Sequence, residues 1–267
     1  MSGLLEKLAM IVRRDLLTRA RYRLGFGIDF LNVLGEVAAF YFLARAVGPN
    51  FRPEGMGYFE FLLIGTGFNT LFATATGAFL GAVQDAQRTG TMEVVLTSAT
   101  PAPLVVFLTS ASAFLGRSLH FFVYLLMGFV IFGASLRGAN IPGFLLIFVL
   151  GLAASMALGI MAAGVQIAIQ RGTAVLWLFS SAMWLFAGGL YPVHSLPTPL
   201  RWVSHLLPIT YALDGIRLAL VRGAGFSQLA APALALAVFC AVLVPLSIFT
   251  LVRSLRYARQ RGTLSFY

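Results

Sequence analysis

The chain has 267 residues, of which 59% are hydrophobic and only 10% are charged, and its mean hydropathy is +0.89. Soluble domains carry about 25% charged residues, so this composition excludes a soluble globular protein and predicts an integral membrane protein. The net charge of +10 would indicate nucleic-acid binding in a soluble protein, but here the basic residues cluster at the edges of apolar segments. The single cysteine, Cys240, excludes an internal disulfide and a cysteine metal cluster.

The first 24 residues predict an amphipathic helix that lies on the membrane surface. Leu4, Leu8 and Ile11 recur at helical spacing, with lysine and arginine between them. A solvated N-terminal helix is the alternative interpretation. The segment lacks the continuous apolar run of a cleavable signal peptide. We therefore divide the chain into an interfacial helix over 1–24 and a transmembrane domain over 25–267.

A helix needs about 20 mainly apolar residues to span a bilayer. Six segments meet this requirement: about 25–47, 58–83, 104–136, 142–169, 173–190 and 230–252. All are expected to be helices, because lipid cannot satisfy the hydrogen bonds of an open sheet edge. The fold class is therefore an all-α integral membrane protein with six transmembrane helices. Basic residues are more frequent on the side that carries the N-terminus, so we expect both termini in the cytoplasm.

The first and third predicted spans each carry polar residues on one face. On the first span these are Asp29, Asn32 and Glu36, and on the third they include Arg117 and His120. Charges inside a membrane are costly and are usually paired or face water. Arg117 would neutralise Asp29 or Glu36, or each charge would face a polar cavity. A more specific alternative is a proton relay through Glu36 and His120.

A polar insert over residues 84–101 separates the second and third predicted spans. Within it Gly90 permits a turn, Thr91 is an N-cap candidate, and Glu93 lies near the positive end of the helix dipole. These residues predict a short cytoplasmic helix over 91–100. An ordinary cytoplasmic loop is the alternative.

Small residues recur every four positions on one face of the second span and on one face of the fourth. The positions are Gly65, Asn69, Ala73, Gly77 and Gly81, and then Gly151, Ser155, Gly159 and Ala163. Such faces let helices approach closely. We expect them to pack within the subunit, and a sliding or gating surface is the alternative.

The fifth predicted span carries an aromatic face that includes Trp177 and Trp184. Large aromatic side chains can line a passage for an apolar substrate, and they also anchor helices at the membrane interface. Both interpretations stay open for these two residues.

The segment over 191–229 is too long for a tight turn and too apolar for a free loop. Prolines interrupt it, among them Pro192 and Pro208. We predict two short helices that enter the outer leaflet without crossing it, the second running from about Pro208 to Val221, with Gly223 ending it.

Three polar side chains fall on the second of these short helices, namely Tyr211, Asp214 and Arg217. Asp214 and Arg217 are three residues apart, a spacing that allows an ion pair on a helix.

Two motifs stand in the insert and after the fifth span. The first reads Gly90-Thr91-Met92-Glu93, followed by Leu96 and Thr100-Pro101, and the second combines Gly189-Leu-Tyr-Pro192 with Pro208-Ile-Thr-Tyr211 and Arg217. With the six spans and the N-terminal helix, they resemble the ABC type-2 permease family, the membrane subunits of type V ATP-binding-cassette exporters. The Pro-Ile-Thr-Tyr version is closer to drug and lipid exporters of that family, although Ile209 replaces the usual leucine.

The resemblance implies a permease subunit of the bacterial inner membrane and not an enzyme. Two copies, expected as a homodimer, would form the pathway for a lipid-like, drug-like or other amphipathic substrate. Two ATP-binding-cassette ATPase subunits would bind ATP and Mg²⁺, so no cofactor or metal is expected on this chain. The residues expected to couple to the ATPase are Arg88, Gly90, Thr91, Met92, Glu93 and Leu96. The sequence agrees with an ATPase on another chain, since it lacks G-x-x-x-x-G-K-[ST] and its only lysine is Lys7.

An ion- or proton-coupled secondary transporter is the alternative function. Such a transporter typically places carboxylates at a central site between broken helices. Asp29 and Glu36 lie in one unbroken span, and we find no inverted repeat. A membrane scaffold or a membrane enzyme is the third interpretation.

Overall fold

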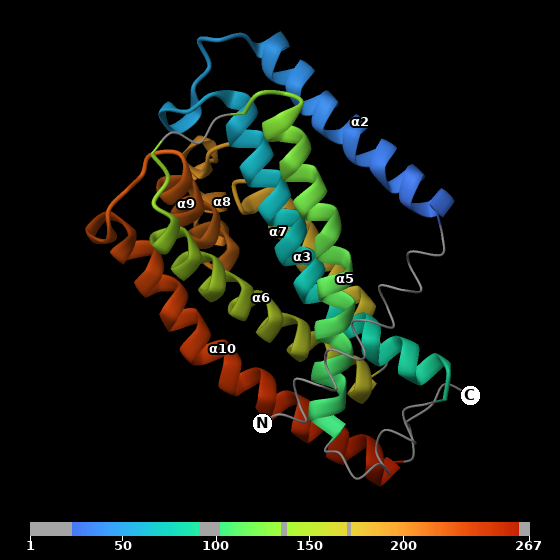
Figure 1. Cartoon of the computed structure of the whole chain (residues 1–267). Coiled ribbons are helices and arrows are strands. Elements are labelled where there is room, and N and C mark those ends of the chain that lie inside the picture. Colours follow the sequence, from blue (N-terminus) through green and yellow to red (C-terminus); the bar gives the residue numbers. More distant parts are fainter. Residues whose placement is uncertain (1–22, 91–101, 135–137, 170–171, 262–267) are drawn as a thin grey trace.

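The computed structural model describes residues 23–90, 102–134, 138–169 and 172–261, and every regular element in these ranges is a helix (Figure 1). Five helices are long and apolar enough to cross a membrane. These are α2 (Arg23–Val47), α3 (Tyr58–Arg88), α5 (Ala102–Val130), α6 (Ile141–Ile169) and α10 (Phe226–Arg261). They confirm a multi-pass, all-helical membrane protein.

The predicted fifth span corresponds to α7 (Gly172–Phe186), which has 15 residues. A span needs about 20 residues, so a sixth crossing stays a prediction. Four shorter elements complete the described part: the 3-10 turns η1 (Pro53–Gly55) and η2 (Val193–Ser195), and the helices α8 (Thr198–His205) and α9 (Pro208–Leu220). The predicted interfacial helix over 1–24, apart from residues 23 and 24, and the predicted helix over 91–100 lie outside the described residues.

Helix α3 is the centre of the bundle. It packs against α2, α5, α6, α7 and α9, while α10 packs on α6 and α9 from the other side. Figure 1 shows α8, α9, η1, the end of α5 and the start of α6 at one end of the molecule, which we call the cap end. The last turns of α3 and α10 and the first turn of α5 lie at the opposite end, which we call the insert end.

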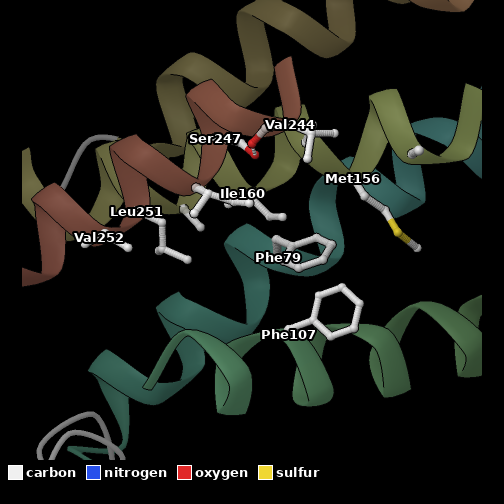
Figure 2. A pocket seen from close by; sticks show the side chains of 12 residues that line it. Phe79, Phe107, Met156, Ile160, Val244, Ser247, Leu251 and Val252 are labelled. Carbon is white, nitrogen blue, oxygen red and sulfur yellow. Dashed lines mark hydrogen bonds between the residues drawn. The ribbon is translucent and has the colours of Figure 1, made fainter. Parts of the chain in front are cut away.

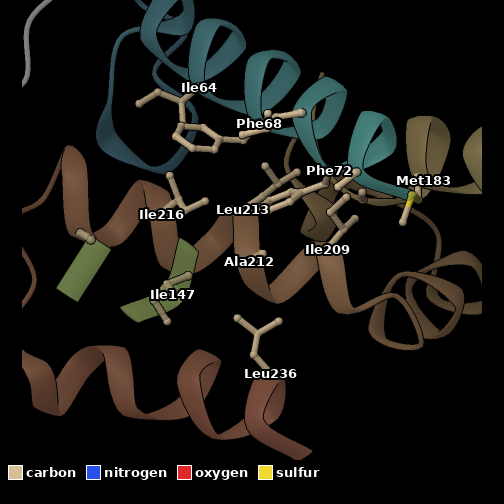
Figure 3. Close-up of a cluster of buried hydrophobic side chains, with 14 of the residues drawn as sticks. Ile64, Phe68, Phe72, Ile147, Met183, Ile209, Ala212, Leu213, Ile216 and Leu236 are labelled. Atoms are coloured by element: carbon tan, nitrogen blue, oxygen red, sulfur yellow. The ribbon is translucent and has the colours of Figure 1, made fainter. Parts of the chain in front are cut away.

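The largest hydrophobic core lies toward the cap end, where α9 is inserted among α3, α6 and α10 (Figure 3). Phe68 and Phe72 of α3 contact this core, and Leu213 and Ile216 of α9 are fully buried in it. A second, smaller core at the insert end contains Phe79, Val83, Ala163, Ile167, Leu251, Leu255 and Ala258. A third core joins α2 to α3 and α5. The largest of the three cores therefore stabilises the position of α9.

Glycines and prolines set the ends of several helices. Pro208 occupies the first turn of α9, and Gly223, at φ +59°, follows its end, as the sequence predicts. The predicted third span over 104–136 is too long, because α5 ends at Val130 and Gly133 turns the chain at φ +72°. Helix α10 extends beyond the predicted 230–252 at both ends. It begins at Phe226, and its arginine-rich last turns remain helical.

The small-residue face of α6 packs within the subunit, as the sequence predicts, against α3 and α9. A Cβ atom on Gly159 would lie only 2.4 Å from the carbonyl oxygen of Thr76, and one on Gly151 only 2.8 Å from Cβ of Ala212. The Thr76 hydroxyl donates a hydrogen bond of 3.1 Å to the Ser155 carbonyl. Small side chains therefore set the distance between α3, α6 and α9.

Candidate functional site

A buried arginine connects the segment after α7 to the helix bundle. Arg217 of α9 is 1% exposed, and its guanidinium carbon lies 3.6 Å from the centre of the Phe61 ring. Its Nη2 atom donates hydrogen bonds to the carbonyl oxygens of Phe61, at 3.3 Å, and Gly189, at 3.2 Å. One side chain therefore joins α9, α3 and the turn after α7.

The missing side chain of Gly65 makes room for this guanidinium. A Cβ atom on Gly65 would lie 2.2 Å from the Gly189 carbonyl oxygen and 2.3 Å from Arg217 Nη2. Among the described residues, Arg217 Nε and Nη1 have no hydrogen-bond partner. The side-chain hydrogen bonds of Arg217 go to backbone carbonyls, so the ion pair with Asp214 stays a prediction.

The short helices α8 and α9 are linked to each other. The Thr210 hydroxyl donates to the Ser204 carbonyl at 2.8 Å, and the Tyr211 hydroxyl donates to the His205 carbonyl at 3.2 Å. The predicted turn residue Pro192 is buried just before η2, and Pro208 is buried at the start of α9. The predicted pair of short helices is therefore one connected unit, while its depth in the membrane stays a prediction.

The cap end is also fastened through its turns. Asn140 Nδ2 donates to the Ala224 carbonyl at 2.8 Å, and Arg222 Nε donates to the Glu54 carbonyl at 3.1 Å. These bonds join the turns before α6, after α9 and before α3. These hydrogen bonds and the burial of Arg217 were not predicted from the sequence. Gly65 and Gly189, which lie beside the guanidinium, were the sequence features that could have indicated the buried arginine.

The polar faces of α2 and α5 meet at one place. Glu36 is exposed and interacts electrostatically with His120 and Tyr124. The Tyr124 and Thr66 hydroxyls are 2.7 Å apart, and because Thr66 donates to the Leu62 carbonyl, Tyr124 donates to Thr66. The structure therefore places Glu36 and His120, the two groups of the relay hypothesis, on helices that pack against each other, and the relay itself stays a prediction.

The other polar candidates of these spans are less closely grouped. Asn32 lies on the exposed side of α2. Asp29 and Arg117 belong to α2 and α5, but their side chains are outside the described part of the structure. Pairing of Arg117 with Asp29 or Glu36 therefore stays a prediction.

Both predicted tryptophans of α7 face outward. Trp177 is 71% exposed and Trp184 is 49% exposed on the surface of the single chain. They do not line an internal passage within one subunit, so lipid or a second subunit would cover them.

The insert is flanked by the end of α3 and the start of α5. Within the described part of the insert, Arg88 and Gly90 are exposed, and Gly90 has φ +69°, which fits the turn predicted there. The coupling candidates Thr91, Met92, Glu93 and Leu96 lie outside the described residues.

A buried amide pair lies close before the predicted helix over 91–100. Gln166 of α6 donates from Nε2 to Oε1 of Gln87 at 3.0 Å, and both side chains are 1% exposed. It ties the last turn of α3 to the end of α6. Sequence reasoning missed this pair, although a glutamine in the last turn before a polar insert could have indicated it.

A comparison with protein families identifies the family of this chain. A family model described as ABC-2 type transporter matches residues 6–221, which include α2 to α9 and the insert. The chain belongs to the ABC-2 transporter family. A search of curated proteins found no match. This ABC-2 chain is therefore a permease subunit of an ABC transporter and not its ATPase, and its family normally works with an ATP-binding-cassette subunit. The resemblance predicted from the two motifs is confirmed.

Proposed function

We propose that this chain is the transmembrane subunit of an ATP-driven exporter in the bacterial inner membrane, with both termini in the cytoplasm. Two copies form a homodimer around a pathway for an amphipathic substrate, lipid-like or drug-like. Separate ATPase subunits bind and hydrolyse ATP with Mg²⁺. The family match over 6–221 is the observation that carries this proposal, because it spans the insert and the whole bundle up to the end of α9.

The insert end supports a coupling role for residues 91–100. Two long helices, α3 and α5, lead directly into the insert, so a partner that pushes on it acts on both. The Gln87–Gln166 hydrogen bond passes a displacement of α3 on to α6. Helices are stiff along their axes, so movement at this end reaches the membrane interior without a mobile loop.

The exposed faces of α2 and α7 support an amphipathic pathway between two copies. Helix α2 presents the polar side chains Asn32 and Glu36, and α7 presents Trp177 and Trp184. An exposed carboxylate facing lipid is costly, so a partner subunit or a polar passage would cover Glu36. A pathway with polar groups on one helix and aromatic groups on another suits a substrate with a polar head and an apolar body.

The alternative is an ion- or proton-coupled secondary transporter, and the observation that favours it is the packing of α2, which carries Glu36, against α5, which carries His120. The two functions differ in their energy source. A proton gradient across vesicles that contain this chain alone drives transport only under the alternative.

Substitutions in the insert test the proposal at single residues. In a complex reconstituted with its ATPase, we expect Glu93→Arg and Gly90→Pro to lower ATP-dependent uptake of fluorescent amphiphiles about tenfold or more, with ATP hydrolysis continuing. Gly90 has φ +69°, which proline cannot adopt. The control is Arg52→Gln, an exposed position directly before η1. Normal uptake in both insert variants would remove the insert from the mechanism.

A binding panel then narrows the substrate class. Thermal melting of the purified complex with phospholipids, glycolipids and apolar drugs should show stabilisation by amphiphiles, because a ligand that binds only the native state raises its stability. Stabilisation by water-soluble sugars alone would contradict an amphipathic substrate.

A further inference from the structure

A cavity lies at the insert end, among α3, α5, α6 and α10 (Figure 2). Its volume is about 330 Å³, within the range of roughly 300–1,000 Å³ typical of ligand pockets. Phe79, Phe107, Met156, Ile160 and Leu251 line it. The lining hydroxyl of Ser247 already donates to the Val244 carbonyl at 2.8 Å. The wall therefore offers packing to an apolar chain and no specific polar contact.

The cavity opens toward the surroundings of the bundle. Two of its lining residues, Phe107 of α5 and Ile248 of α10, are 43% and 55% exposed. Helix α5 packs mainly on α3, whereas α10 packs mainly on α6, so the two helices flank an opening. In a membrane this opening faces acyl chains, because α3, α5, α6 and α10 are all candidate spans.

Helix α10 carries arginines directly after the residues that line the cavity. Val252 lines the cavity, and Arg256 is four residues further, one turn or about 6 Å along the same helix face. Arg253 and Arg256 are both exposed, and α10 contains no acidic residue. The last turn of α3 carries Arg88 together with one carboxylate, Asp85. The arginines of α10 therefore lie where a lipid headgroup would be if its acyl chain entered the cavity.

We propose that this cavity binds one acyl chain of an anionic phospholipid from the leaflet at the insert end, with Arg253 and Arg256 contacting the headgroup phosphate. Both parts of the site are needed to specify this ligand. A free phosphate would leave the apolar cavity unfilled, and an uncharged apolar compound would not use the arginines. Basic residues beside clefts between cytoplasmic helix ends commonly hold anionic headgroups. The lipid is a resident ligand at the side of the bundle, away from the exposed faces of α2 and α7.

Native mass spectrometry of the full chain tests the site without its ATPase. The probes are phosphatidylglycerol and phosphatidylcholine with identical acyl chains, titrated into the detergent-solubilised protein. We expect phosphatidylglycerol to bind about tenfold more tightly than phosphatidylcholine, and Arg253→Gln combined with Arg256→Gln to abolish the difference. The matched charge control is Arg52→Gln, directly before η1, which should leave the difference unchanged.

Filling the cavity tests the acyl-chain half of the proposal. Ala157→Phe and the milder Ala153→Leu place carbon in the cavity and should lower binding of both lipids. Ala39→Phe on the exposed side of α2 is the control, and thermal melting establishes that each variant is folded. Equal binding of the two lipids by the unaltered chain would overturn the headgroup assignment. Unchanged binding in a folded Ala153→Leu variant would overturn the cavity assignment. Neither outcome bears on the partnership with an ATPase.

Discussion

The two ends of this bundle are held together in different ways. At the cap end, α9 is buried in the largest core and Arg217 joins it to Phe61 and Gly189. At the insert end, a smaller core surrounds a cavity of about 330 Å³, and one described amide pair, Gln87–Gln166, ties α3 to α6. The difference indicates a fixed cap and a more deformable insert end.

This difference between the two ends fits a transporter on which its partner acts from the insert end. Buried hydrogen bonds and close packing make a region stiff, because any displacement breaks several contacts together. Helix ends beside a cavity can shift with less loss of packing. We therefore expect a force on the insert to change the spacing of α3, α5 and α10 before it disturbs α9.

Among the substitutions that test this difference between the two ends, Arg217→Met should lower stability the most. The substitution removes charge-assisted hydrogen bonds to two backbone carbonyls and leaves the Gly189 carbonyl unsatisfied, which costs roughly 3 kcal/mol of stability. Thermal melting in detergent should show a large drop in the melting temperature. The control Arg52→Gln alters an exposed arginine and should melt like the unaltered chain. Equal melting of both variants would mean that Arg217 does not hold the cap.

An intermediate effect is expected from a pair of glycine substitutions in neighbouring helices. Gly159→Ala places a Cβ atom 2.4 Å from the Thr76 carbonyl oxygen and must push α3 and α6 apart, at a cost of about 1–3 kcal/mol. Gly81→Ala adds the same atom where nothing lies within 4 Å, so it should stabilise the helix by up to about 1 kcal/mol. Melting shifts of the same sign in the two variants would contradict the close α3–α6 contact.

The smallest change in stability should come from the amide pair at the insert end. Gln87→Leu leaves the Gln166 amide without this acceptor and should cost about 1 kcal/mol. With the ATPase bound, the ratio of transport to ATP hydrolysis should fall more than the melting temperature suggests. The double variant Gln87→Leu with Gln166→Leu should recover stability but not coupling. A parallel recovery of both would assign the pair a structural role only.

Much of the fold could be predicted from the sequence, because its determinants are local. Apolar runs predict the long helices, Pro208 and Gly223 predict the limits of α9, and the spacing of Gly151, Ser155 and Gly159 predicts the close approach of α6. The end of α5 could not be placed, because apolar residues continue beyond the turn at Gly133.

The direction of the Arg217 side chain could not be predicted for a different reason. On the isolated helix, Asp214 is its nearest partner in sequence, and water is an equally good one. The actual slot exists because Gly65, which has no side chain, lies against the carbonyl of Gly189, more than a hundred residues away in the sequence. Gln87 and Gln166 are likewise paired only by tertiary packing.

The central claim is that this ABC-2 chain is moved by an ATPase on another polypeptide, and purification from native membranes tests it most directly. The tagged chain should bring down a P-loop ATPase in stoichiometric amount, and the isolated complex should hydrolyse ATP. Glu93→Arg should weaken this association or its coupling. Absence of any ATPase, together with robust transport by the chain alone under a proton gradient, would contradict the account.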